Sequence, residues 1–178
     1  VGARADGEDA AAGTVELPAG LFSGTRARDC IEFFNAVDAE MTGRMIAFVR
    51  KELGCKALIT NNNSWTNQVT GQGVRSLYDY VDDHFYVDHP RFLEQPWRLP
   101  SRCPNTSPVA GGATGGRPLA FTRLFDKPFT VTEINHPFPS EYAAEGLPIA
   151  AAYASFLDWD GVFWYSFSHT EPSAWRPS

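Results

Sequence analysis

The chain has 178 residues, of which 43% are hydrophobic and 13% are aromatic, and this composition predicts one globular domain with a buried core and excludes a disordered chain. A net charge of −6 offers no basic surface to a phosphate backbone, so we expect no nucleic-acid partner. No apolar run approaches the ~20 residues that cross a bilayer, and the first residues lack the basic start of a signal peptide, so we expect no membrane partner. A secreted or periplasmic location is compatible with this composition.

The three cysteines, Cys30, Cys55 and Cys103, are odd in number and widely spaced. This spacing fits neither a disulfide framework nor a zinc ribbon. We therefore expect packed or free thiols, with one bridge left open for an exported protein. The sequence leads us to expect no cofactor and no metal ion.

Residues 1–28 are rich in alanine and glycine, so we expect a flexible linker or arm before a folded domain at residues 29–178. Asp29 and, three residues later, Glu32 form a capping-box pattern that predicts the start of a helix. Apolar residues then recur at helical spacing until Gly54 provides a stop signal. We expect this apolar stripe to lie in the core; its members are Ile31, Phe34, Val37, Met41, Met45, Phe48 and Val49.

Four apolar runs are predicted as buried strands, at residues 55–60, 80–87, 129–134 and 161–169. The last two strands each follow a predicted helix, at about 118–125 and 141–157. A stretch rich in proline and glycine lies between residues 91 and 117, where we expect long irregular loops. Nearly continuous apolar strands that alternate with helices indicate an α/β fold with a parallel sheet.

Polar and aromatic side chains gather where these strands end. In parallel α/β folds, ligands bind outside the carboxyl ends of the strands. A cleft that combines hydroxyl-binding groups with aromatic rings suits a carbohydrate. The residues at the four strand ends are Asn61, Asn62, Asn63 and Trp65; His84, Tyr86 and His89; Glu133, Asn135 and His136; and Trp164, Ser168 and His169.

The segments "FTVTEINHPFP" and "EYAAEGLPIAAAYASFLDWDGVFWYSFSH" resemble the last two βα units of clan A glycoside hydrolases, which are retaining (β/α)8-barrel enzymes such as cellulases, mannanases and β-galactosidases. The resemblance implies that Glu133 is the catalytic nucleophile. In "DDHFY", it implies that Tyr86 hydrogen-bonds this nucleophile and that His84 lies beside it. Trp164 resembles the aromatic residue that floors the sugar subsite. Under this hypothesis the other substrate-binding residues are Asn61, Asn63, Trp65, Asn135, His136 and His169.

The sequence departs from that family at the second catalytic carboxylate. The family's acid/base is a Glu usually preceded by Asn, and no Asn-Glu pair occurs in the chain. Four strands fill half of a TIM barrel, which takes about 250 residues, so the resemblance implies strands five to eight, the C-terminal half. Retaining hydrolysis needs two carboxyl groups about 5–5.5 Å apart, and the candidates for the second one are Asp82, Asp83, Asp88, Glu141 and Glu171. We expect the isolated chain to be inactive or weakly active unless a second copy or a missing half-barrel completes the site.

Each of these features also has a simpler explanation. Glu133 could be a structural carboxylate that pairs with Arg123 or with a helix N-terminus, and "NNNSW" could be an ordinary turn. His84, His89 and His136 match no closed zinc pattern, so a metal-dependent hydrolase is the weaker hypothesis. The main alternative to a glycosidase is a non-catalytic carbohydrate-binding or interaction half-barrel that self-associates to cover its strand edges.

Overall fold

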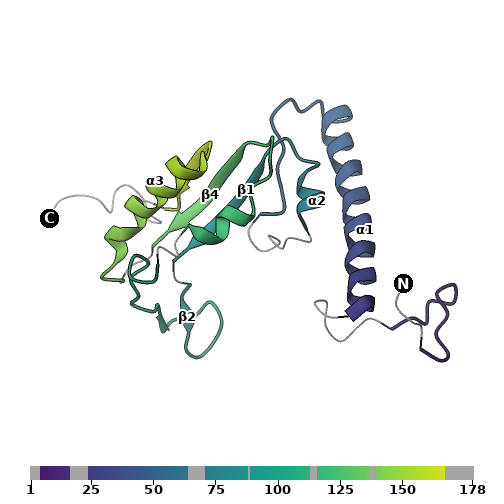
Figure 1. Ribbon diagram of the computed structural model, residues 1–178, viewed down its shortest axis with the longest axis horizontal. Coiled ribbons are helices and arrows are strands. Elements are labelled where there is room, and N and C mark those ends of the chain that lie inside the picture. The colour runs from purple at the N-terminus through teal and green to yellow at the C-terminus, as the bar shows by residue number, and fades with distance from the viewer. Residues whose placement is uncertain are drawn as a thin grey trace.

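The computed structural model describes residues 5–16, 24–63, 71–87, 89–112, 116–136 and 139–166. Three parallel strands form the central sheet in the order β1-β4-β5 (Figure 1). A short antiparallel pair, β2 with β3, lies in the segment rich in proline and glycine. The expected mixed α/β fold with a parallel sheet is therefore confirmed. The elements in chain order are α1 (Gly24–Lys51), α2 (Gln72–Arg75), β1 (Val81–Tyr86), β2 (Arg91–Phe92), β3 (Ser101–Arg102), the 3-10 helix η3 (Arg117–Phe121), β4 (Phe129–Asn135), the 3-10 helix η4 (Ala143–Glu145), α3 (Gly146–Leu157) and β5 (Gly161–Trp164).

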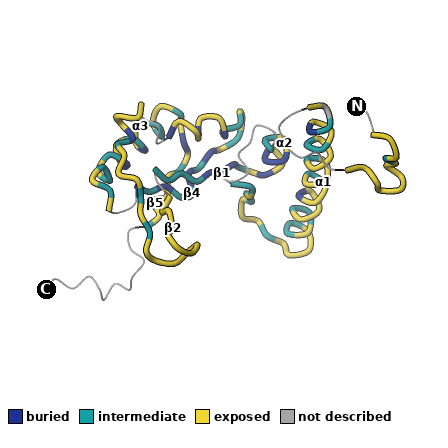
Figure 2. Tube along the Cα trace, turned by 90° about the horizontal axis from the view of Figure 1, so that it is seen from below, coloured by how far each residue is buried: buried dark blue, intermediate teal, exposed yellow. Residues whose placement is uncertain are grey.

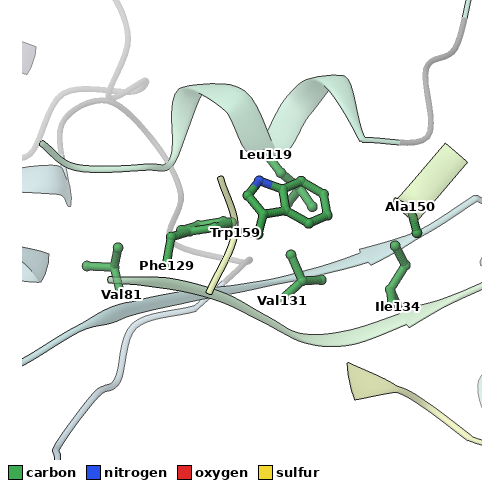
Figure 3. Packing of buried hydrophobic residues seen from close by; sticks show 7 residues of the cluster. All are labelled: Val81, Leu119, Phe129, Val131, Ile134, Ala150 and Trp159. Atoms are coloured by element: carbon green, nitrogen blue, oxygen red, sulfur yellow. The ribbon is translucent and has the colours of Figure 1, made fainter. Parts of the chain in front are cut away.

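The hydrophobic core lies between one face of this sheet and the helical segments η3 and α3. Side chains of β1 and β4 point toward these helical segments (Figure 3). Because successive strand residues point to opposite faces, the other face of β4 carries polar side chains. The core consists of Val81, Leu119, Phe129, Val131, Ile134, Ala150 and Trp159.

An irregularity in the pairing of β1 with β4 sets the register of the polar residues. Asp83 pairs with Val131, but the next residue, His84, pairs with Glu133, so Thr132 is the extra residue on β4. A bulge of this kind re-aims side chains. Here it places two polar residues in succession on β4 before Ile134 returns to the core.

The prediction of a buried strand at residues 55–60 is wrong. The segment forms no strand, and Leu58 is exposed. Side chains bind much of its backbone: the Arg50 guanidinium donates to the carbonyl oxygens of Cys55 and Ala57. The carboxylate of Asp79 accepts from the Ile59 amide, so these groups cannot continue a strand ladder beside β1.

The first helix begins at Gly24, five residues before the expected capping box, and its apolar stripe is not in the core. Figure 2 shows α1 at one end of the molecule, largely exposed and separate from the sheet. The helix is held by a Thr42–Tyr78 hydroxyl contact of 3.3 Å and by an ion pair between Arg50 and Asp79. The periodicity of a helix predicts which of its faces is apolar. Whether that face is buried depends on whether another part of the protein packs against it.

The remaining boundaries differ less from expectation. The predicted helix at 118–125 is the shorter 3-10 helix η3, and the helix expected at 141–157 consists of η4 and then α3. The fourth predicted strand corresponds to β5, which ends at Trp164. The three cysteines are free thiols. No helix in the described part of the chain is both long and apolar enough to cross a membrane.

Candidate active site at the carboxyl end of the parallel sheet

Glu133, Tyr86 and His84 meet at the carboxyl ends of β1 and β4. The Tyr86 hydroxyl donates a hydrogen bond to Oε2 of Glu133. Nδ1 of His84 lies 3.5 Å from the same oxygen. The Glu133 side chain remains 32% exposed, so this carboxylate is held by two neighbours and is still open to a ligand.

The His84 ring is oriented by an amide on its other side. Nδ2 of Asn63 lies 2.9 Å from Nε2 of His84 and 3.4 Å from Oδ2 of Asp82. An ionised carboxylate only accepts hydrogen bonds, so the Asn63 NH2 group must face Asp82, and it then also donates to Nε2 of His84. A neutral His84 whose Nε2 accepts carries its proton on Nδ1, which is the nitrogen that faces Glu133.

Asp82 connects the segment before Asn63 to the sheet. Its carboxylate accepts hydrogen bonds from the hydroxyls of Thr60, at 2.9 Å, and Thr132, at 2.6 Å. These hydrogen bonds offset the cost of removing the buried Asp82 carboxylate from water. They also explain how Asn63, which belongs to no helix or strand, is positioned beside β1.

A buried arginine anchors β1 from the opposite side. The Arg75 guanidinium donates to the carbonyl oxygens of Asp82, at 2.6 Å, and Thr122, at 2.7 Å, and to the side chain of Gln72. Burial lowers the pKa of Arg75, whereas the neighbouring carboxylates of Asp83 and Asp82 oppose that shift. Arg75 therefore fixes the strand residue that precedes Asp83 and His84.

Tyr86 is held as a neutral donor. Burial raises the pKa of its hydroxyl, and the hydrogen bond to the Glu133 carboxylate raises it further. The ring also packs against His89, with 5.2 Å between the ring centroids. The phenol therefore keeps its proton, and its hydrogen bond to Glu133, through the neutral pH range.

Three other predicted site residues, Asn135, His136 and Trp164, have different partners in the structure. Asn135 donates to the carbonyl of Tyr165 and accepts from the backbone of His136. His136 is 3% exposed, and its ring lies 3.0 Å from the hydroxyl of Ser140. Trp164 packs against the hydrophobic core, on the helix-covered side of the sheet.

The remaining predicted residues lie elsewhere. Asn61 lines a separate groove beside α1, and Trp65 and His169 lie outside the described residues. The roles assigned to all of these residues stay predictions. Sequence reasoning overlooked Thr60, Thr132 and Arg75, because a threonine or an arginine near a strand carries no signal of its own in a single sequence.

Among the described residues, no second carboxylate contacts Glu133, and no ion pair joins it to Arg123. Asp83 pairs in register with the core residue Val131, so it lies on the helix-covered face, and Glu141 is exposed. Asp88 and Glu171 fall outside the described ranges. Within those ranges no three metal-ligating side chains gather, so the histidines form no closed metal site.

A cavity of about 450 Å³ lies at the opposite end of the strands. Its walls include Lys127, Pro128, Asp158 and Asp160, next to the start of β4 and of β5. The Asp160 carboxylate already accepts the backbone N–H of Phe129. We therefore assign the candidate site by its converging side chains and not by cavity size.

No family model, no curated protein and no solved structure matches this chain. The site is thus described by its own geometry: an accessible carboxylate, a neutral phenol and an oriented imidazole at the carboxyl end of a parallel sheet.

Proposed function

We propose that Glu133 is the nucleophile of a retaining glycoside hydrolase and that Tyr86 and His84 position it. The proposal rests on one observation: Tyr86 and His84 both contact the same oxygen of Glu133, Oε2. No hydrogen bond to Oε1 is found among the described residues, so one oxygen is held and the other is available for attack.

The chemistry follows from this asymmetry. Oε1 attacks the anomeric carbon, a carbon–oxygen bond forms, and the bond to the leaving oxygen breaks with its electron pair. Retaining hydrolysis then requires water to cleave the glycosyl-enzyme ester, which restores the carboxylate. The Tyr86 hydroxyl and Nδ1 of His84 hold Oε2 of Glu133 in place, which leaves Oε1 directed at the substrate during this cycle.

A second carboxyl group must protonate the leaving oxygen, and we propose that it comes from outside the described residues. In this hypothesis β1, β4 and β5 are the sixth, seventh and eighth strands of a (β/α)8 barrel. The acid/base would then lie on the complementing half.

A second candidate function is binding of a carbohydrate without hydrolysis. The observation that favours it is that no described carboxylate is paired with Glu133 in the way that a two-carboxylate mechanism needs. Under this hypothesis the polar face recognises a sugar, and Glu133 accepts hydrogen bonds from its hydroxyls.

Glycosides with a very acidic leaving group separate these two functions, because a dinitrophenolate departs without a proton from the enzyme. We would incubate the chain with a panel of 2,4-dinitrophenyl 2-deoxy-2-fluoroglycosides and analyse the protein by mass spectrometry. The fluorine slows hydrolysis of the ester, so a nucleophilic Glu133 should retain one covalently bound sugar. Glu133→Gln should take up none, whereas Glu141→Gln, a change of the same kind at an exposed position, should be labelled like the parent.

Peptide mapping should place the sugar on Glu133, and added azide should release it, because azide attacks the ester without a general base. A sugar on another residue, or no covalent sugar from any member of the panel while a glycoside still binds reversibly, would overturn the nucleophile assignment and favour the binding function.

The positioning of His84 has a test that does not depend on turnover. In ¹⁵N NMR spectra of the imidazole, neutral His84 should be protonated at Nδ1. Asn63→Leu removes the donor to Nε2, so the population of that tautomer should fall, whereas Asn61→Leu should leave it unchanged. Equal spectra for the parent and Asn63→Leu would contradict the arrangement.

A further inference from the structure

An apolar stripe runs along one side of α1 and faces solvent. With 3.6 residues per turn, its five positions fall within an arc of about 80° and extend over about 21 Å of helix. Figures 1 and 2 show that α1 stands at one end of the molecule, away from the sheet. An exposed apolar surface of this length marks an interaction site. The stripe consists of Phe34, Val37, Met41, Met45 and Phe48, each between 44% and 59% exposed.

The stripe borders a groove, so it is more than a flat surface. Met41 and Met45 form one wall of a cavity of about 260 Å³, and residues 59–62 form the other. A partner helix seated on the stripe would therefore also contact the segment that leads to Asn63.

We propose that a second copy of this chain covers the stripe, with the two α1 helices antiparallel and related by a twofold axis at Met41. The five positions are symmetric about this residue: Phe34 and Phe48 lie seven residues on either side of it, and Val37 and Met45 lie four. In an antiparallel pair, Phe34 therefore faces Phe48 of the second copy, and Met41 faces its own equivalent. An isologous interface requires this kind of self-complementarity.

The charges along α1 select the antiparallel orientation. From residue 29 onward, acidic residues precede basic ones: Asp29, Glu32, Asp38 and Glu40 fall in residues 29–40, and Arg44, Arg50 and Lys51 in residues 41–51. Arg26 and Arg28, at the start of the helix, already pair with Glu8 and Glu32 of the same chain. A parallel pair would bring like charges together, whereas an antiparallel pair brings the acidic segment of each copy beside the basic segment of the other.

One charge pair shows how this would work locally. Glu40 and Arg44 lie on the same flank of the stripe and form an exposed ion pair within one copy. In the antiparallel dimer the same flanks of the two helices adjoin, so Glu40 also comes close to Arg44 of the second copy. Arg50 contributes less to the attraction between the two copies, because it is already paired with Asp79 in its own chain.

The area of the stripe predicts a weak dimer. An aromatic side chain buries about 150–250 Å² in full, and valine and methionine are smaller, so covering the exposed half of these five side chains removes at most about 500 Å² per copy. The total of about 1,000 Å² lies at the lower end of specific interfaces. We therefore expect an equilibrium between monomer and dimer that depends on protein concentration.

The oligomeric state is the first test. Analytical ultracentrifugation from micromolar to near-millimolar concentration should show a monomer–dimer equilibrium for the parent chain. Met41→Asp should shift it to monomer, whereas Ala36→Asp, a change of the same kind at an exposed position outside the stripe, should leave it unchanged. Circular dichroism would confirm that both variants keep the helix. A parent chain that stays monomeric over this range would overturn the proposal.

Disulfide trapping tests the orientation. In a background with Cys30, Cys55 and Cys103 changed to Ser, a mixture of Val37→Cys and Met45→Cys chains should form the mixed disulfide dimer on mild oxidation. Val37→Cys alone should not link to itself. Self-linking of Val37→Cys in preference to the mixed product would show a parallel pair and refute the arrangement. Neither test depends on the chemistry of Glu133.

Discussion

Replacing Arg75 by Met should destabilise the protein more than any exposed substitution. The Arg75 side chain has no exposure to solvent, and it donates to the carbonyl oxygens of Asp82 and Thr122. Met retains much of the volume of Arg but none of its donors or its charge. The variant would leave two buried carbonyl oxygens without these donors and would remove the positive charge nearest to the buried carboxylate of Asp83.

The expected cost can be estimated from these contacts. Leaving a buried hydrogen-bond acceptor without its donor costs about 1–3 kcal/mol, so the two carbonyl oxygens together account for about 2–6 kcal/mol. A domain of this kind is stable by about 5–15 kcal/mol, so the change removes a large part of the free energy of unfolding. Arg98→Met, at an exposed position, should change stability by no more than about 0.5 kcal/mol.

Equilibrium unfolding in urea, followed by tryptophan fluorescence and circular dichroism, measures both variants. Asp83→Leu alone should also be costly, but the double variant Arg75→Met/Asp83→Leu should cost less than the sum of the two, because no charge is then left alone. If Arg75→Met behaved like Arg98→Met, the bonds from Arg75 to the two carbonyl oxygens would not stabilise this fold as described; if the two core changes were additive, the charges of Arg75 and Asp83 would not be coupled.

Two further predictions concern single contacts. Because burial and Glu133 raise the pKa of Tyr86 from the usual 10.0, this neutral phenol stabilises the fold below pH 10, and that contribution is lost as the pH rises further. In urea titrations, the Tyr86→Phe variant should therefore lose less free energy of unfolding between pH 9 and pH 11 than the parent chain does. An equal loss in both proteins would contradict the assignment. At Gly116 an added Cβ would lie 2.4 Å from the Tyr153 ring, so Gly116→Ala should cost about 1–3 kcal/mol. Gly73→Ala, which meets no atom within 4 Å in a helix, should instead stabilise by about 0.5–1 kcal/mol in the same assay.

The local patterns of the sequence predicted the elements of the sheet. The apolar runs at 80–87 and 129–134 became β1 and β4, because β-branched and aromatic residues in succession need burial on a pleated surface. The position of Glu133 at the end of such a run was enough to mark it as a candidate site residue. Neighbouring parallel strands end at one edge, so His84 and Tyr86 could also be expected nearby.

The contacts inside the site could not be predicted in the same way. The bulge at Thr132 decides that His84 stands opposite Glu133, and a bulge has no signature in one sequence. The hydrogen bonds that Asp82 accepts from Thr60 and Asn63 join residues about 20 positions apart. These pairings depend on the path of the chain between them.

Burial was the property that local patterns predicted least well. The periodicity of α1 identified an apolar face, and the run at 55–60 had the composition of a buried strand. Whether either is buried depends on what packs against it, and the tertiary structure leaves the helical stripe in solvent and binds the 55–57 carbonyls with Arg50. The sequence by itself thus determined which surfaces are apolar and where the carboxylate stands, because both are properties of consecutive residues. Only the tertiary structure decided which of those surfaces are covered and which side chains hold the carboxylate, because both require residues that are distant in the chain to meet.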